Sequence, residues 1–144
     1  MMKYLLFLMM VISIMGKCEA MSESNLICQT IAREATSGDF EDMVAIGKVL
    51  RNRLALGYYG KSYQEVILSK WQFSCWNDGT YQKERSQEQL EQAAKAFEIS
   101  AMESDFPATH YYNPEVSGDP SWASSPQMKY LCTIGKHKYY QETR

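Results

Sequence analysis

The chain has 144 residues, of which 45% are hydrophobic and 12% aromatic, and its formal net charge at pH 7 is −2. This length is enough to bury one hydrophobic core, so we expect a single catalytic or binding domain rather than several. The slightly acidic balance argues against a nucleic acid or an anionic membrane surface as the partner.

The first twenty residues have the pattern of a secretory signal peptide. Lys3 supplies the positive start, and the apolar stretch 5–15 is too short to span a bilayer comfortably. The sequence ending at Ala20 fits a cleavage site. We therefore predict a signal peptide over 1–20 and a secreted or periplasmic domain over 21–144, a monomer without a membrane span once processed. A signal anchor that stays in the membrane is the alternative.

Processing would leave three cysteines, Cys28, Cys75 and Cys132. Export permits one disulfide among them. We predict the pair Cys75–Cys132 because each lies in a loop or strand region, whereas Cys28 has apolar helical neighbours and is expected as a buried thiol. The chain has no C-x-x-C pair, so we expect no metal site, and we expect no cofactor.

Two amphipathic helices are predicted before residue 58. The first has an apolar face from Leu26 to Glu34 and a cap at Ser22 or Ser24. The second carries an apolar stripe over 43–54 and stops at Gly57.

Two further helices are predicted, separated by an ordered loop over 71–81. The sequence 62–65 is a capping box that opens a short helix ending at Leu68. Ser86 caps the last helix. The core stripe expected for this helix is formed by Leu90, Ala93, Ala94, Phe97 and Ala101.

The periodicity changes after Pro107. Residues 109–112 favour a strand, and 130–140 favour a hairpin that turns at Gly135. Between them, 114–126 holds three of the four prolines and is expected to be a long loop. Helices first and a small β element last predict an α+β fold.

Glu34 is the strongest candidate for chemistry. It shares a helical face with Ile27, Thr30 and Ile31. A carboxyl group at the end of a buried helix is costly unless it is paired or protonated. A protonated carboxylic acid that faces a polar, aromatic groove is what cleavage of a glycosidic bond needs.

Other side chains leave several chemistries open. A two-carboxylate hydrolase needs a second acid, and only Asp39 and Asp78 are plausible, although both fit better as turn or cap residues. The two histidines, His110 and His137, could pair with Cys75 as in a cysteine amidase, but each could equally be structural. Aromatic side chains in loops offer faces on which sugars stack.

Five sequence blocks, in this order and spacing, resemble the SleB-type cell wall hydrolases, a family of spore cortex-lytic enzymes. The resemblance covers nearly all of the chain after residue 25. The blocks are Ala32-Arg33-Glu34-Ala35, residues 43–53 ending in Asn52-Arg53, Gln72-Phe73-Ser74, residues 108–114 with Pro120-Ser121-Trp122, and residues 134–139.

The resemblance implies a lysozyme-like fold, a helical bundle followed by a small β element. It also implies lytic transglycosylase cleavage of peptidoglycan glycan strands between N-acetylmuramic acid and N-acetylglucosamine, with Glu34 as the catalytic residue. One carboxyl group suffices when it protonates the glycosidic oxygen and then takes the proton of the muramyl 6-hydroxyl. For this role we expect apolar surroundings to raise the pKa of Glu34. The family's second acidic residue is lost here or moved to Asp39.

From these blocks we also predict the residues that bind substrate, as stacking rings or as hydrogen-bonding partners of sugar hydroxyls. They are Gln72, Phe73, Ser74, His110, Tyr111, Tyr112, Asn113 and Trp122.

Three other functions remain open on the sequence. A hydrolytic muramidase on the same scaffold would use Asp39 to help activate water. A Cys–His peptidase or amidase would use Cys75. A non-catalytic protein would bind glycan in an exposed aromatic groove.

Overall fold

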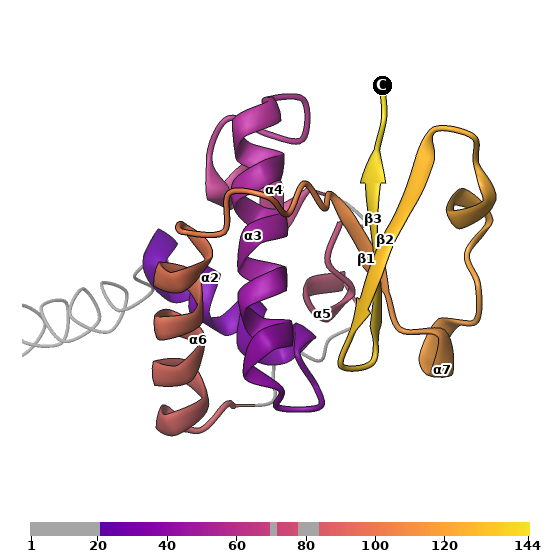
Figure 1. The fold of residues 1–144 in the computed structure, drawn as a ribbon. Helices are drawn as coiled ribbons and strands as arrows, with labels where there is room; N and C mark the ends of the chain where they lie inside the picture. The colour runs from indigo at the N-terminus through magenta and orange to yellow at the C-terminus, as the bar shows by residue number, and fades with distance from the viewer. Residues whose placement is uncertain (1–20, 70–71, 78–83) are drawn as a thin grey trace, which may run out of the picture.

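The structure, a computed structural model, describes residues 21–69, 72–77 and 84–144. A layer of helices packs on one side of a three-stranded antiparallel sheet, as Figure 1 shows. The predicted α+β class is confirmed. The predicted signal peptide over 1–20 lies outside the described residues, as do parts of the predicted loop 71–81. Within the described residues, no helix is both long and apolar enough to cross a membrane.

The first two described helices begin and end where the sequence places their caps. Helix α2 spans Glu23–Glu34, and the Ser22 side chain accepts a hydrogen bond from the backbone N–H of Asn25. Helix α3 spans Phe40–Leu56. Its N-cap is Asp39, and Gly57 ends it with a φ of 81°, which favours glycine.

Helices α4 (Tyr63–Leu68) and α6 (Gln87–Ser100) also start at their predicted serines. The core stripe predicted for α6 is partly wrong. Its buried positions are Ala93, Ala96 and Ser100, whereas Ala101 is exposed. The reason is the close approach of α3, because a Cβ added at Gly47 would lie 3.0 Å from the Ser100 hydroxyl.

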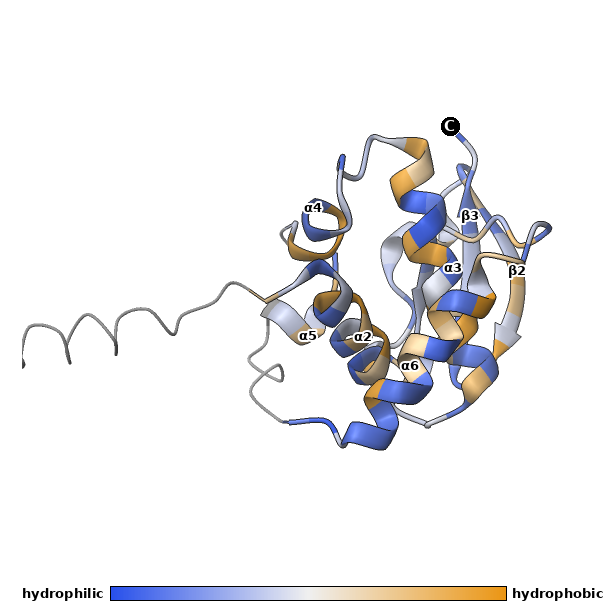
Figure 2. Ribbon diagram, turned by 90° about the vertical axis from the view of Figure 1, so that its left-hand side faces the viewer, coloured by the Kyte–Doolittle hydropathy of each residue, from blue (hydrophilic) through white to orange (hydrophobic). Residues whose placement is uncertain are grey.

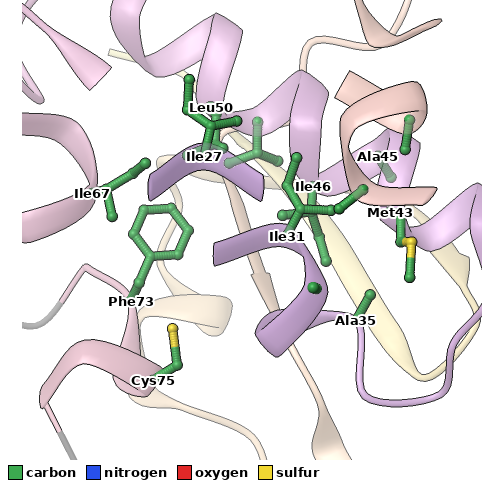
Figure 3. Packing of buried hydrophobic residues seen from close by; sticks show 14 of the residues in the cluster. Ile27, Ile31, Ala35, Met43, Ala45, Ile46, Leu50, Ile67, Phe73 and Cys75 are labelled. Atoms are coloured by element: carbon green, nitrogen blue, oxygen red, sulfur yellow. The ribbon is translucent and has the colours of Figure 1, made fainter. Parts of the chain in front are cut away.

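The core lies where α2, α3, α4 and the segment before the short helix α5 (Ser74–Asn77) meet (Figure 3). Helices α2, α3, α4 and α6 each carry hydrophobic and hydrophilic positions, as Figure 2 shows by colour. The largest fully buried apolar residues, apart from Tyr139, are Phe73, Ile31, Met43, Ile46, Leu50, Ile67, Val49 and Val66.

The sheet contains strands β1 (His110–Tyr112), β2 (Met128–Ile134) and β3 (His137–Glu142) in the order β1-β3-β2. The predicted hairpin is confirmed, and its turn uses Gly135 with a φ of 58°. The register pairs Tyr111 with Tyr139 and His110 with Tyr140. We call the face with Tyr111, His137 and Tyr139 the inner face, and the face with His110, Tyr112 and Tyr140 the outer face.

Two predicted loops contain short helices. Helix α5 lies within the predicted loop 71–81, and α7 (Pro114–Ser117) and a 3₁₀ turn (Ser121–Ser124) lie within the predicted loop 114–126. Asn113 caps α7 and Pro114 occupies its first turn, a favoured pair of positions for these residues. Single turns are too short to carry an apolar repeat, so periodicity did not reveal them.

The predicted disulfide is wrong in this structure. Cys28, Cys75 and Cys132 are not disulfide-bonded. Cys75 belongs to the buried core, whereas Cys132 lies on the edge strand β2 and is only partly buried against that core. The expected burial is also reversed, because Cys75 is the buried thiol and Cys28 is only half-buried.

Candidate active site

A cleft of about 520 Å³ lies between the end of α2, the start of α5 and strands β1 and β3. Six of the nine predicted site residues line it, namely Glu34, Gln72, Ser74, Tyr111, Tyr112 and Asn113. The predicted substrate-binding set had not included the other lining residues, although Cys75 and His137 were considered as a catalytic pair. They are Arg33, Thr36, Arg53, Cys75, Arg85, Val116, Ser117 and His137.

Glu34 is the last residue of α2, half-buried at the cleft. Its Oε2 accepts a hydrogen bond of 2.9 Å from the Tyr111 hydroxyl. Its Oε1 is buried and has no hydrogen-bond partner among the described residues. A buried oxygen in this state is costly until a proton or a ligand donor reaches it, so Glu34 has one anchored oxygen and one available oxygen.

Tyr111 holds Glu34 from the inner face of β1. Burial raises the pKa of the Tyr111 hydroxyl well above its ordinary value, and the nearby Glu34 carboxylate raises it further. The phenol therefore keeps its proton and acts as a hydrogen-bond donor to Glu34.

The Asn52-Arg53 pair ties the end of α3 to both walls of the cleft. Asn52 donates to the carbonyls of Phe106 and Ala108 at 2.9 and 2.8 Å. Arg53 donates to the carbonyl of Thr109 at 2.7 Å and to the Gln72 side chain at 2.9 Å. These bonds fix the backbone of the segment that leads into β1 and the orientation of the Gln72 side chain. Asn52 and Arg53 therefore position both walls of the site.

A buried polar cluster joins α3 to β3 behind the cleft. Asp42 is fully buried, and its Oδ2 lies 2.7 Å from Nδ1 of His137. Its Oδ1 accepts a hydrogen bond of 2.5 Å from the Tyr139 hydroxyl. The sequence reasoning missed Asp42, because an acidic residue in the first turn of a helix is ordinarily explained by the helix dipole.

Three predicted substrate-binding residues lie outside the cleft lining. Phe73 is buried in the core at 1% exposure. His110 and Trp122 contact each other on the outer face as tilted rings with centroids 5.2 Å apart, and Trp122 also lies edge-on to Tyr112 at 5.5 Å. These two rings therefore support Tyr112 from behind, and only Tyr112 reaches the cleft.

The cleft has a cationic lining with one described carboxyl group. Arg33, Arg53 and Arg85 contribute guanidinium groups, and Glu34 is the one acid among the lining residues that the structure describes. Burial lowers the pKa of Arg53 from its ordinary value, yet an arginine remains charged at neutral pH. The groove therefore suits a ligand with many hydroxyl or carboxylate oxygens.

Cys75 and His137 line the same cleft, each with an exposed fraction of 5%. The lining histidine, His137, directs Nδ1 to Asp42. In the described ranges no group of three or more His, Cys, Asp or Glu side chains is arranged to hold a metal ion. The carboxyl group of Glu34, with one oxygen held by Tyr111 and the other without a described partner, suits acid–base chemistry.

Two solved structures share this fold. One is the catalytic domain of the germination-specific lytic transglycosylase SleB from Bacillus anthracis, with a TM-score of 0.66 and 19% identity over 85% of this chain and 97% of that one. The other is the catalytic domain of the Bacillus cereus SleB protein, with a TM-score of 0.67 and 20% identity over 85% and 92%.

A family profile described as Cell Wall Hydrolase matches residues 37–140. No curated protein matches the chain. The matched span contains most of the cleft lining and begins after Glu34, so the role of this carboxyl group is argued from its geometry. The match covers well over half of the sequence, and the chain is therefore a member of the cell wall hydrolase family.

Proposed function

We propose that the chain cleaves peptidoglycan glycan strands between N-acetylmuramic acid and N-acetylglucosamine as a lytic transglycosylase, with Glu34 as its catalytic acid. The observation that carries the proposal is the placement of Glu34, with one oxygen held by Tyr111 and the other buried without a partner in the cleft. The SleB catalytic domain from Bacillus anthracis, described as a lytic transglycosylase, has the same fold and supports this assignment.

The reaction needs one proton donor beside the scissile bond. Glu34 protonates the glycosidic oxygen through its available oxygen, and the bond from that oxygen to the anomeric carbon breaks. The muramyl 6-hydroxyl then attacks the anomeric carbon and closes a 1,6-anhydro ring. The hydroxyl proton is accepted within the site, so the reaction consumes neither water nor a second carboxylate.

The single described carboxyl in the cleft favours this route over hydrolysis. Asp39 caps α3 by accepting a hydrogen bond from the Glu41 backbone N–H, and it is not among the cleft-lining residues. Asp42 is buried and engaged by His137 and Tyr139. Neither acid is placed to activate a water opposite Glu34, as a two-carboxylate hydrolase requires.

Substrate contacts are proposed for the five other predicted residues that line the cleft. Tyr112 offers a ring face, and the remaining four offer hydrogen bonds to sugar hydroxyls or acetamido groups. These four are Gln72, Ser74, Tyr111 and Asn113. His110, Trp122 and Phe73 are proposed to shape the cleft through packing.

The protein is proposed to act outside the cytoplasm as a monomer. The predicted signal peptide over 1–20 would deliver it to the wall, where its substrate lies. The proposal includes no cofactor, because the carboxyl group and the substrate hydroxyl supply both protons that move.

The test is digestion of purified sacculi by the wild type and by Glu34→Gln, followed by mass spectrometry of the soluble products. We expect anhydro-muramyl ends from the wild type and a loss of about 10²–10⁴-fold in the Gln variant. Unfolding in urea should show that Glu34→Gln is folded. An active Glu34→Gln protein would refute the proposal.

The same digest separates the alternatives. Reducing muramyl ends would identify a hydrolytic muramidase. Binding to sacculi without soluble product would identify a glycan-binding protein. Loss of cleavage in Cys75→Ser, with the released products showing cut peptide rather than cut glycan, would identify a thiol amidase.

A further inference from the structure

His137 has no role in the reaction described above. It lines the same cleft as Glu34. Its ring packs edge-on against the ring of Tyr111, with centroids 4.9 Å apart and an interplanar angle of 76°. The hydroxyl of Tyr111 also donates a hydrogen bond to Glu34. One tyrosine therefore contacts both the carboxyl group from α2 and the imidazole from β3.

Asp42 determines which nitrogen of His137 faces away from the protein interior. Both carboxylate oxygens of Asp42 are engaged, Oδ1 by the Tyr139 hydroxyl and Oδ2 by Nδ1 of His137. A carboxylate only accepts hydrogen bonds, so a neutral His137 carries its proton on Nδ1. The lone pair of the ring is then on Nε2.

Nε2 is the ring nitrogen of His137 that Asp42 does not engage. The hydrogen bonds of this ring to other described residues use Nδ1. His137 lines the cleft and has an exposed fraction of 5%. An imidazole lone pair at the wall of a sugar cleft accepts a proton from a hydroxyl group.

We propose that His137 is a second catalytic residue, the base that takes the proton of the attacking sugar hydroxyl, with Asp42 as its positioning residue. This inference rests on the proposed function and assigns its two proton transfers to two residues. Glu34 supplies a proton to the leaving oxygen, and His137 receives one from the nucleophile.

The step balances as follows in atoms and electrons. The O–H bond of Glu34 breaks and its proton joins the glycosidic oxygen, which leaves with the electron pair of the broken C–O bond. The muramyl 6-oxygen forms the new bond to the anomeric carbon, and its proton moves to Nε2. The imidazolium of His137 then returns a proton to the Glu34 carboxylate, which restores the starting state.

A base must be neutral, so the division of roles has a signature in the pH dependence of the rate. The titratable groups in contact with His137 or its partner are Asp42 from α3, Tyr139 from its own strand and Tyr111 from β1. The cleft that His137 lines also holds the charged or titratable side chains of Glu34, Arg33, Arg53 and Arg85. A reaction that uses one base and one acid gives a rate that falls on the acid side, where the base is lost, and on the alkaline side, where the acid is lost.

The test measures the release of anhydro-muropeptides from sacculi across pH by His137→Gln and His137→Ala. We expect kcat to fall about 10²–10⁴-fold at near-constant KM. The acid-side fall of the profile should disappear in His137→Gln, and added imidazole should restore part of the activity of His137→Ala. A purely structural histidine would give neither result.

Two changes around Asp42 form a matched pair. Asp42→Asn can donate to Nδ1 and so moves the neutral imidazole proton to Nε2, which should lower kcat as strongly as His137→Gln. Tyr139→Phe removes the other hydrogen bond of the same carboxylate but leaves the Nδ1 contact, so it should keep the acid-side fall and most of kcat. Urea unfolding checks that each protein is folded.

The outcomes separate this inference from the proposed function. If Glu34→Gln is inactive while His137→Ala and Asp42→Asn keep the wild-type rate and pH profile, His137 is not the base and the proposed function stands. If Glu34→Gln is active, the proposed function itself fails. If both His137 variants are unfolded, the kcat of Asp42→Asn relative to Tyr139→Phe decides, and equal values overturn the inference.

Discussion

The two faces of the small sheet are both rich in aromatic rings, but they are built differently. On the inner face, tyrosine and histidine donate to carboxyl groups from the helices, with Tyr111 bound to Glu34, and His137 and Tyr139 bound to Asp42. These side chains are held in place by directional bonds between distant parts of the chain. Groups held in this way are suited to chemistry because their orientation is fixed before substrate arrives.

On the outer face, the rings pack mainly on one another. Trp122 lies within 5.2–5.5 Å of His110, Tyr112 and Tyr140, measured between ring centroids. The carboxylate partner of this face, Asp119, is 72% exposed at its side chain. Ring packing gives area and rigidity without fixing a proton donor. The comparison indicates that the inner face carries the chemistry and the outer face supports it.

The largest difference between the faces should appear in stability. Asp42→Ala removes a buried acceptor from two donors, so we expect the free energy of unfolding to fall by about 3–5 kcal/mol. Asp119 also accepts from a tyrosine hydroxyl, that of Tyr112 at 2.6 Å, but in solvent. Asp119→Ala is the matched control and should show no measurable loss in urea unfolding. If Asp42→Ala and Asp119→Ala lose equal free energies of unfolding, the two faces do not differ in this way.

A smaller effect is expected on catalysis from Tyr111→Phe. This change removes one hydroxyl and leaves the ring that packs against His137. A hydrogen bond to a charged group is worth about 1.5–3 kcal/mol, so kcat should fall about 10–100-fold. Rates on purified sacculi measure it.

Tyr112→Phe is the control for Tyr111→Phe, because its hydroxyl donates to Asp119 rather than to Glu34. It should lower kcat less than Tyr111→Phe does. If Tyr112→Phe lowers kcat more than Tyr111→Phe does, the outer face and not the inner face supports the proton transfer.

The smallest expected effect is the pH dependence of the stability contributed by His110 on the outer face. Burial, with help from Arg53, lowers the pKa of His110 to about 4, against about 6.5 in an unfolded chain. The neutral ring therefore stabilises the fold above pH 6.5, and this contribution is lost as the pH falls toward 4. The difference in unfolding free energy between the wild type and His110→Asn should narrow from pH 7 to pH 5. A gap that widens would contradict the assigned direction.

Caps and turns were the part of the fold that the sequence predicted best. Ser22, Ser86 and Gly57 mark helix ends through local hydrogen bonds or a left-handed backbone, and a local rule can be read from neighbouring residues. Gly135 at the hairpin turn is of the same kind. The α6 stripe was less accurate, because its buried side depends on the approach of Gly47 from another helix.

The candidate site was predicted in part, for the same physical reason. Glu34 stood out because its own helix face is apolar, and Tyr111 and Gln72 came from their sequence blocks. Asp42 was missed because its partners are 95 and 97 residues away along the chain. The partners of a buried carboxylate cannot be predicted from its neighbours in sequence. For the same reason the sequence did not reveal that Cys75 and Cys132 are not bridged.

The long separation between Asp42 and the final hairpin has a consequence for the order of folding. Helices form early because their contacts are local, whereas pairing across so many residues carries a large loop-closure cost and comes late. Until β3 docks, Asp42 stays hydrated and the wall of the cleft that bears His137 is missing. A chain still being synthesised would therefore lack one wall of the cleft, and activity would arise only when the last strand has docked.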